Sequence, residues 1–280
     1  MSLDQGIAKH LGSEIVSRHA IGTGLFDAYQ LQLSDGTTVF AKHQSQANQE
    51  LINEGRELTL LGQFVSTPKV LGSDEQLLIL EWIESAHNPN VQQQLGEQLA
   101  TLHRQHQDHF GFAFDNKIGQ TPQHNAPELK LTDWGQFYWQ YRLKFQIELA
   151  EKNGYLQQKD IDLLLKVENK LDQLIDIEVR PSLLHGDLWS GNFLSAKDQP
   201  YLIDTASYYG HREADLALTF IFGGFSQAFY QSYQAHYPLE TGFEKRKPLY
   251  MLYHYLNHLN LFGSGYYQST LNCARQLFSA

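Results

Sequence analysis

The chain has 280 residues, of which 42% are hydrophobic and 19% charged, and its formal net charge is −10. This length is sufficient for a hydrophobic core in one large domain or in two lobes. An acidic chain lacks the clustered Lys and Arg that general binding to nucleic acids or anionic membranes requires, so we expect neither partner. A single cysteine, Cys273, excludes an internal disulfide framework and favours a reducing compartment.

The N-terminus and the apolar runs of the chain indicate a soluble protein, and the reducing compartment favoured by the single cysteine is the cytoplasm. The first residues show no basic and apolar signal pattern. The most apolar run, residues 77–83, is interrupted by Glu81 and is too short to span a bilayer.

Residues 15–83 show the pattern of several strands with one helix among them. Residues 27–33 alternate apolar and polar side chains, and Ser34-Asp35-Gly36 is typical of a hairpin turn before a returning strand at 37–42. A second hairpin is expected from residues 70–73 and 76–81. The polar and helical composition after Ile83 predicts a boundary there, with lobes at 1–83 and 84–280.

Gly22-Thr23-Gly24, between the first two strands, resembles the front of a glycine-rich phosphate loop. Missing side chains let backbone N–H groups approach a phosphate. Asp27 stands where the third glycine of the G-x-G-x-x-G pattern belongs. An ordinary hairpin turn is therefore an equally good interpretation.

Lys42 ends the third predicted strand, and a helix is expected over residues 47–63. Glu54 shares the apolar face of this helix and could meet Lys42 across the gap between helix and sheet. A Lys–Glu pair of this kind would direct the ammonium toward nucleotide phosphates. Glu50 and Glu57 are rival partners, and we prefer Glu54 because of its position on the buried face.

The remaining chain is predicted to be mostly helical. Helices are expected at residues 91–106, 132–152 and 159–175, with a loop at 111–125 and further helices toward the C-terminus. Aromatic and apolar residues at helical spacing in the second helix predict a core-facing stripe, which consists of Trp134, Tyr138, Tyr141, Phe145 and Leu149.

The segment that best indicates chemistry is His185-Gly186-Asp187, with Asn192 four residues beyond the Asp and Asp204 after a short turn and strand. Kinase catalytic loops have this spacing. Phosphoryl transfer requires one carboxylate near the acceptor hydroxyl, together with an amide oxygen and a second carboxylate that hold Mg²⁺ on the phosphates. Acidic residues in an ordinary turn are the alternative, and the combined match of spacing and strands disfavours it.

Other catalytic chemistries match less well. His254 and His258 are four residues apart on a predicted helix, but Tyr255 stands where a zincin has its Glu. No G-x-S-x-G elbow occurs, which disfavours an α/β-hydrolase. Cys273 is better explained as a core residue than as a nucleophile.

Two strings, 184–192 and 208–217, make the sequence similar to the fructosamine (ketosamine-3-) kinase family, which is a small-molecule branch of the protein-kinase-like superfamily. The resemblance implies an α+β, bilobal kinase fold with an antiparallel N-terminal sheet. It also implies ATP-dependent phosphorylation of the sugar 3-hydroxyl of a ketosamine, either small or attached to a protein lysine, which releases the amine and repairs glycation.

Carried over by position, the resemblance implies a role for each matched residue. Asp187 would be the general base, and Asn192 and Asp204 would hold Mg²⁺. Lys42, with Glu54, would orient the phosphates. The backbone of the hinge at Glu81, Trp82 and Ile83 would bind the adenine of ATP, and Gly22 and Gly24 would approach its phosphates.

Trp189 could lie against the ketosamine or pack beneath the loop, and Asp215 is expected to brace the catalytic loop or to cap a helix. Gly186 replaces the Arg of protein kinases, so no phosphorylation switch through that Arg is expected. The chain departs from the family pattern at Thr205, commonly Pro, and at His211, often Asp. It also lacks the cysteine that some relatives carry in the glycine-rich loop.

Two alternatives to a ketosamine kinase remain open. One is another small-molecule kinase of the same fold, acting on an aminoglycoside, an amino alcohol such as choline or a free sugar. The other is a catalytically silent nucleotide-binding module. The sequence leaves the preferred sugar and the oligomeric state open.

Overall fold

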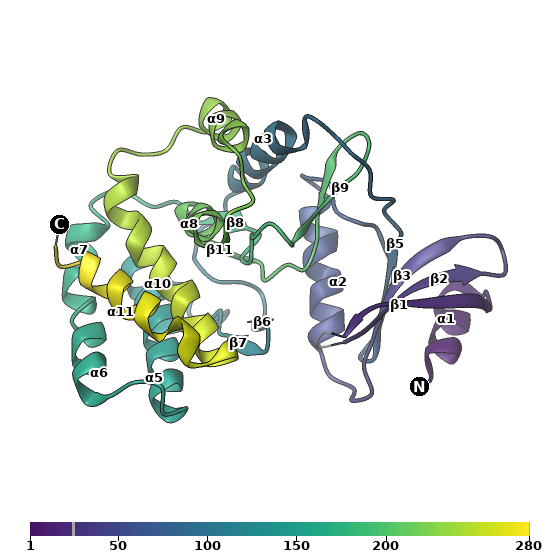
Figure 1. Ribbon diagram of the computed structural model, residues 1–280, viewed down its shortest axis with the longest axis horizontal. Helices are drawn as coiled ribbons and strands as arrows, with labels where there is room; N and C mark the ends of the chain where they lie inside the picture. Colours follow the sequence, from purple (N-terminus) through teal and green to yellow (C-terminus); the bar gives the residue numbers. More distant parts are fainter. Residues whose placement is uncertain (24–25, 280) are drawn as a thin grey trace.

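The computed structural model describes residues 1–23 and 26–279 and has a five-stranded sheet near the N-terminus, followed by a mostly helical C-terminal part (Figure 1). The strands lie in the order β1-β2-β3-β5-β4, and all neighbours are antiparallel. This arrangement confirms the predicted α+β class. The strands are β1 (Ile15–Thr23), β2 (Asp27–Leu33), β3 (Thr38–His43), β4 (Val70–Ser73) and β5 (Leu77–Glu81).

Helices cover both faces of this sheet. Helix α1 (Leu3–Leu11) lies on one face and α2 (Glu50–Leu61) on the other (Figure 1). Successive side chains of a strand point to opposite faces, so the unbroken apolar run of β5 serves both layers. Leu77 and Ile79 pack with the α1 layer, whereas Leu78 and Leu80 pack with α2.

Helix α1 is absent from the sequence-based expectation, although its N-terminus carries a recognisable signal. Ser2 accepts a hydrogen bond from the backbone of Gln5, and the Gln5 side chain accepts one from the backbone of Ser2. This capping box satisfies two of the N–H groups that a helix start leaves without partners.

The C-terminal part is built from helices around one large apolar core. Within residues 26–279, no helix combines the length and the apolar character needed to cross a membrane. The helices are α3 (Val91–His103), α4 (Trp134–Tyr138), α5 (Lys144–Lys152), α6 (Gln158–Leu165), α7 (Leu171–Leu174), α8 (Glu213–Phe222), α9 (Gln227–His236), α10 (Phe243–Phe262) and α11 (Tyr267–Gln276), with short 3₁₀ turns at Glu168–Lys170 and Ser264–Tyr266.

Two sequence-based expectations for this part are wrong. The loop expected at 111–125 contains a hairpin, β6 (Asn116–Ile118) and β7 (Thr121–Gln123), whose strands are too short to show a clear alternation. The single helix expected at 159–175 is instead divided into α6, a 3₁₀ turn and α7.

The helix expected at 132–152 exists, and Trp134 and Tyr138 of the predicted stripe are buried, but the buried face departs from the stripe beyond Tyr138. A π-helical segment, Trp139–Leu143, joins α4 to α5. A π turn adds one residue to the helical repeat, so the buried face beyond it moves by one position. Arg142 and Ile147 are buried, whereas Tyr141 and Phe145 of the predicted stripe are only half-buried.

Two small antiparallel ladders frame the segment that carries the kinase-like motif. β8 (Ser182–Leu184) pairs with β11 (Tyr208–Gly210), and β9 (Phe193–Ser195) pairs with β10 (Pro200–Leu202). These ladders therefore bring two segments together beneath α2. One is the loop between β8 and β9, and the other is the segment between β10 and β11.

Candidate active site

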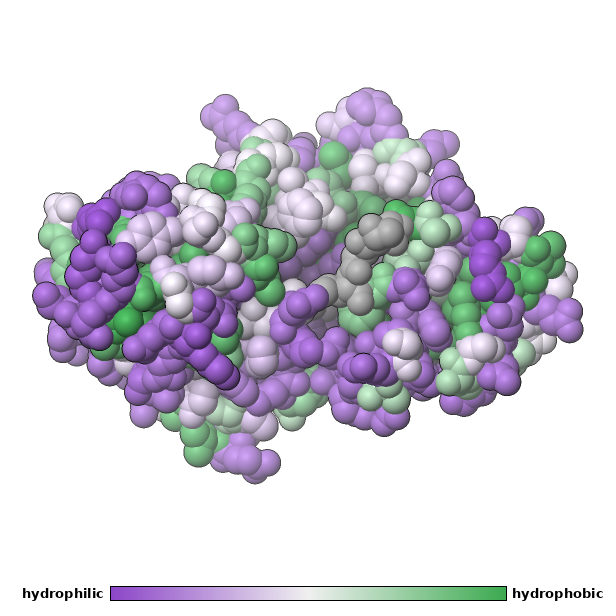
Figure 2. Space-filling view, turned by 60° about the horizontal axis from the view of Figure 1, so that its bottom comes forward, coloured by the Kyte–Doolittle hydropathy of each residue, from purple (hydrophilic) through white to green (hydrophobic). Residues whose placement is uncertain are grey.

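A cleft of about 930 Å³ lies between the sheet and the helical part. Figure 2 shows the molecule hollowed between these two parts. The sheet, α2, the β6–β7 hairpin and the segments 187–194 and 203–206 all contribute to its walls. Of the site residues predicted from sequence, those lining the cleft are Lys42, Glu54, Glu81, Trp82, Ile83, Asp187, Trp189, Asn192 and Asp204.

The loop that carries Asp187 is fixed from below by a buried carboxylate at the start of α8. Asp215 accepts hydrogen bonds from the backbone nitrogens of His185 (2.7 Å) and Gly186 (2.8 Å). Burial would raise the pKa of Asp215, but a hydrogen bond from His103 and the one from Gly186 hold it below its usual value. Asp215 therefore braces the catalytic loop, one of the two roles expected for it.

Gly186 is required at its position for two reasons. Its φ of +87° lies in the left-handed region that favours glycine. A Cβ at this position would also collide with the backbone oxygen of Ala206. The backbone at Ala206, just before β11, can therefore approach the catalytic loop closely only because residue 186 has no side chain.

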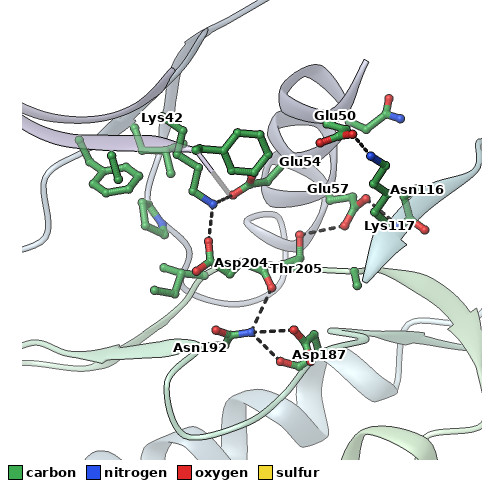
Figure 3. A pocket seen from close by; sticks show the side chains of 18 of the residues that line it. Lys42, Glu50, Glu54, Glu57, Asn116, Lys117, Asp187, Asn192, Asp204 and Thr205 are labelled. Atoms are coloured by element: carbon green, nitrogen blue, oxygen red, sulfur yellow. Dashed lines mark hydrogen bonds and ion pairs between the residues drawn. The ribbon is translucent and has the colours of Figure 1, made fainter. Parts of the chain in front are cut away.

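Asp187, Asn192 and Asp204 converge at the base of the cleft (Figure 3). The amide nitrogen of Asn192 lies 2.8 Å from the backbone oxygen of Asp187, 3.2 Å from its Oδ2 and 3.3 Å from the backbone oxygen of Asp204. Burial and the negative charge of Asp204 raise the pKa of Asp187 to about 7. The carboxylates of Asp187 and Asp204, beside the neutral amide of Asn192, thus form an acidic group in which a cation would be stabilised.

Lys42 reaches into the cleft between two carboxylates, as Figure 3 shows. Its Nζ lies 2.6 Å from Glu54 Oε1 and also contacts Asp204 Oδ1. Burial would lower the pKa of Lys42, but the charges of Glu54 and Asp204 outweigh it and raise that pKa. The preferred partner of Lys42, Glu54, is thus the one that the structure places beside it.

The predicted hinge follows the end of β5. Glu81 pairs with Val39 of β3, and its backbone nitrogen donates to the oxygen of Lys69. The indole of Trp82 donates to Glu84 at 3.0 Å. Glu81, Trp82 and Ile83 thus line the cleft where the chain leaves the sheet.

The predicted glycine-rich loop is only partly described. Gly22 is a β1 residue that is paired with Ala28 of β2, next to an irregularity in the strand register. Gly24 lies outside the described residues. The phosphate-loop interpretation of this segment therefore stays a prediction.

Trp189 is 41% exposed and lines the cleft two residues beyond Asp187. Its ring lies over Gly191, where a Cβ would collide with it. One side of the indole is therefore supported by the loop, and the side chain is not buried beneath it.

Sequence reasoning missed Asn116 and Lys117, and it considered Glu50 and Glu57 only as partners of Lys42. Glu57 is buried and contacts Asn116, and burial raises the pKa of Glu57 to about 8. Lys117 of the hairpin forms an ion pair with Glu50 at the start of α2 (Figure 3). Asn116 and Lys117 fall in the segment expected to be a loop, so no signal in the sequence placed them opposite α2.

His254 and His258, which have the spacing of a zincin pair, both lie in α10. No group of three or more His, Cys, Asp or Glu side chains in the described part of the chain is arranged to hold a metal ion. His254 is buried in α10, and His258 Nδ1 lies 2.8 Å from the backbone oxygen of His254.

Comparisons with known sequences identify the family. The sequence model described as fructosamine kinase matches residues 1–280. A chloroplastic protein-ribulosamine 3-kinase of Oryza sativa subsp. indica is 37% identical over 93% of this chain and 78% of its own length. A ketosamine-3-kinase of Mus musculus is 34% identical over 91% of this chain and 93% of its own length.

Solved structures agree with this assignment. A fructosamine-3-kinase candidate from Thermobifida fusca superposes with a TM-score of 0.92 and 32% identity, covering 100% of this chain and 99% of that one. A choline kinase from Streptococcus pneumoniae shares the fold at a TM-score of 0.66 and 16% identity, covering 99% and 98%. The protein-kinase-like fold is thereby confirmed, and the chain belongs to the fructosamine kinase family.

Proposed function

We propose that this chain transfers the γ-phosphoryl group of ATP to the sugar 3-hydroxyl of a ketosamine and so starts the removal of the sugar from a glycated amine. The convergence of Lys42, Asp187, Asn192 and Asp204 in one cleft carries the proposal. The family and the names of its relatives supply the class of acceptor.

ATP would bind between a nucleotide-binding lobe, residues 1–83, and a catalytic lobe, residues 84–280. Its adenine would lie at the backbone of Glu81, Trp82 and Ile83. The Lys42 ammonium, oriented by Glu54, would offset the charge of the phosphates. A fixed cation of this kind is a chief source of stabilisation for the transition state of phosphoryl transfer, because the protein does little covalent chemistry in that step.

The residues present fit a magnesium ion. Lys42 lies between the carboxylates of Glu54 and Asp204 and contacts Asp204 as a cation would. The charge of Asp204 also raises the pKa of Asp187, so a cation near these two carboxylates would be stabilised. Asn192 and Asp204 would hold the ion with oxygen ligands. When bound, Mg²⁺ neutralises part of the phosphate charge.

Asp187 would orient the acceptor hydroxyl and take its proton as the new bond to phosphorus forms. The exposed face of Trp189 is suited to pack against the apolar face of the sugar. A free sugar amine and a glycated lysine on a protein present the same atoms to these two residues.

The test is ATP consumption with Mg²⁺ on a panel of acceptors. Ribulosamine- and fructosamine-modified lysine are compared with unmodified lysine, choline and an aminoglycoside. We expect turnover on the ketosamines alone, with phosphate on the 3-hydroxyl. Turnover only on choline or the aminoglycoside would replace the acceptor with another small molecule, and binding of ATP without any turnover would favour a silent nucleotide-binding module.

A further inference from the structure

Helix α2 carries two carboxylates one turn apart that have different partners. Glu54 contacts Lys42, whereas Glu57 points to the segment that follows Asp204 (Figure 3). Glu57 is only 2% exposed. Burial of a carboxylate costs free energy unless its oxygens accept hydrogen bonds, so we expect the partners of Glu57 to be hydrogen-bond donors.

Glu57 receives three hydrogen bonds, and two of them come from the segment beyond Asp204. The hydroxyl of Thr205 donates to Oε2 at 2.9 Å, and the backbone nitrogen of Ser207 donates to the same oxygen at 2.8 Å. The third comes from Asn116 in the hairpin, whose Nδ2 lies 2.7 Å from Oε1. Glu57 therefore joins α2 to residues 205–207 and to the β6–β7 hairpin.

The hairpin holds the same segment from its other side. Asn116 Nδ2 also donates to the backbone oxygen of Ser207 at 2.9 Å, and Gln123 Nε2 donates to that of Ala206 at 2.9 Å. Both amide side chains are buried. Buried hydrogen-bond networks of this kind favour a single arrangement of the backbone.

Asp204 needs such support because its backbone is strained. Its φ of +54° is uncommon for a residue with a side chain. Such a conformation persists only where the surrounding structure determines it. On the upstream side, the nitrogen of Ile203 donates to the oxygen of Asn192 at 3.1 Å. On the downstream side, Thr205 and Ser207 are held by Glu57.

We propose that Glu57 is a positioning residue for phosphoryl transfer, which holds Thr205 and Ser207 and thereby fixes the carboxylate of Asp204 toward the nucleotide. This inference rests on the proposed role of Asp204 in the kinase reaction. It assigns to α2 a double function, because one helix face orients Lys42 through Glu54 and Asp204 through Glu57.

The decisive variant is Thr205→Val, which removes the hydroxyl and keeps the branched shape. Thr205→Ser restores the donor. Thr59→Val is the matched control, because Thr59 is an exposed α2 residue whose hydroxyl bonds only to its own helix, at the oxygen of Gly55. Glu57→Gln is a second probe, since an amide can accept on one side only and leaves either Asn116 or the 205–207 segment without its acceptor.

We expect Thr205→Val and Glu57→Gln to raise the KM for MgATP or lower kcat by on the order of tenfold, with the KM for the acceptor unchanged. Thr205→Ser and Thr59→Val should stay within about twofold of the parent protein. In the nucleotide-free protein, hydrogen exchange of the backbone at 205–207 should be faster by about tenfold in the two disruptive variants.

Unchanged exchange would overturn the claim that Glu57 holds the segment. Faster exchange with unchanged kcat and KM would overturn the positioning role, because the contact would then serve stability alone. If the parent protein phosphorylates no ketosamine, the kinetic readout is replaced by the factor by which Mg²⁺ tightens ATP binding. Loss of that factor in Thr205→Val would support the positioning role although the proposed acceptor had failed, and its retention would overturn it.

Discussion

Asp187 has a carboxylate neighbour, and this neighbour determines the pH range in which Asp187 can act as a base. Burial and the charge of Asp204 raise the pKa of Asp187 to about 7 in the nucleotide-free protein. Because a raised pKa keeps the acid protonated below that value, kcat/KM for MgATP should fall as the pH decreases through about 7. The acidic limb of the pH profile of kcat should lie at lower pH than that of kcat/KM, because a bound cation offsets the charge of Asp204.

These two limbs are measured from initial rates at saturating acceptor, with MgATP either limiting or saturating. A kcat/KM that is constant between about pH 6 and 8 would contradict the assignment of Asp187 as the base. Coincident limbs in kcat and kcat/KM would contradict the effect attributed to the charge of Asp204.

Substitution of Asp187 by Asn tests the same residue without a change of pH. The amide keeps the size of the side chain but cannot accept the hydroxyl proton, so kcat should fall by about 10² or more. Binding of MgATP, measured by calorimetry, should stay close to that of the parent protein. Asp198→Asn, in the exposed turn between β9 and β10, is the matched control and should leave both quantities unchanged. Substantial turnover by Asp187→Asn would refute a general-base role.

Some residues of the cleft and its supports could be predicted from the sequence and others could not, for a physical reason. Lys42 and Glu54 can be paired in advance, because a strand end and the buried face of the next helix must meet. Glu57 shares that face at a spacing of three residues, so periodicity alone does not say which carboxylate takes which partner. Asn116 and Gln123 acquire their role only when the hairpin folds against residues 205–207.

At the scale of whole elements, the π-helical segment shows where periodicity fails. A strict helical repeat predicts that Tyr141 and Phe145 face the core, but the additional residue turns Arg142 there instead. A charged residue in a core position contradicts the hydrophobic pattern, so no count of apolar residues could have identified it. This change of register places a buried donor beside His124 and Asn125, which follow the β6–β7 hairpin.

Arg142 should be a principal support of the hairpin. Its Nη1 donates to the backbone oxygen of His124 at 2.6 Å, its Nη2 donates to Asn125 Oδ1 at 2.7 Å, and its guanidinium lies 4.0 Å from the ring centre of Tyr208. Arg142→Met should therefore lower the free energy of unfolding by about 3 kcal/mol, because buried acceptors lose their donors. Denaturant unfolding measures this loss.

The control for Arg142→Met is Arg275→Met, on the exposed side of α11. Its effect on the free energy of unfolding should be below about 0.5 kcal/mol. Equal effects of the two substitutions would show that the contacts of Arg142 contribute no specific stability.

At the scale of the whole molecule, the order of elements could be predicted better than their contacts. Strands before helices, with a motif-bearing loop between short strands, specify the α+β class. The connections between the two parts could not be predicted. The ion pair of Lys117 with Glu50 and the bond of Asn53 to the backbone of Asp115 join α2 to the hairpin across 62 to 67 positions of sequence. Contacts between residues so far apart in the chain produce no periodic pattern in the sequence.

The single cysteine provides a probe of whether the two parts unfold together. Cys273 is 4% exposed on α11, and burial raises the pKa of its thiol to about 12. In the native state it should react with a thiol reagent only when the surrounding structure opens. If that opening is global, it also destroys the cleft. MgATP at 100 times its dissociation constant should then slow the labelling by about 100-fold.

Labelling rates are measured by mass spectrometry with and without MgATP, at reagent concentrations where the rate follows the population of the open state. Labelling that ATP does not slow would instead show local release of α11 from α10, with the cleft intact. The two results separate a cooperative molecule from one in which the C-terminal helix opens alone. The cooperative result is expected, because Cys273 belongs to the same apolar core as Leu184, which precedes the catalytic loop, and Leu188, which lies within it.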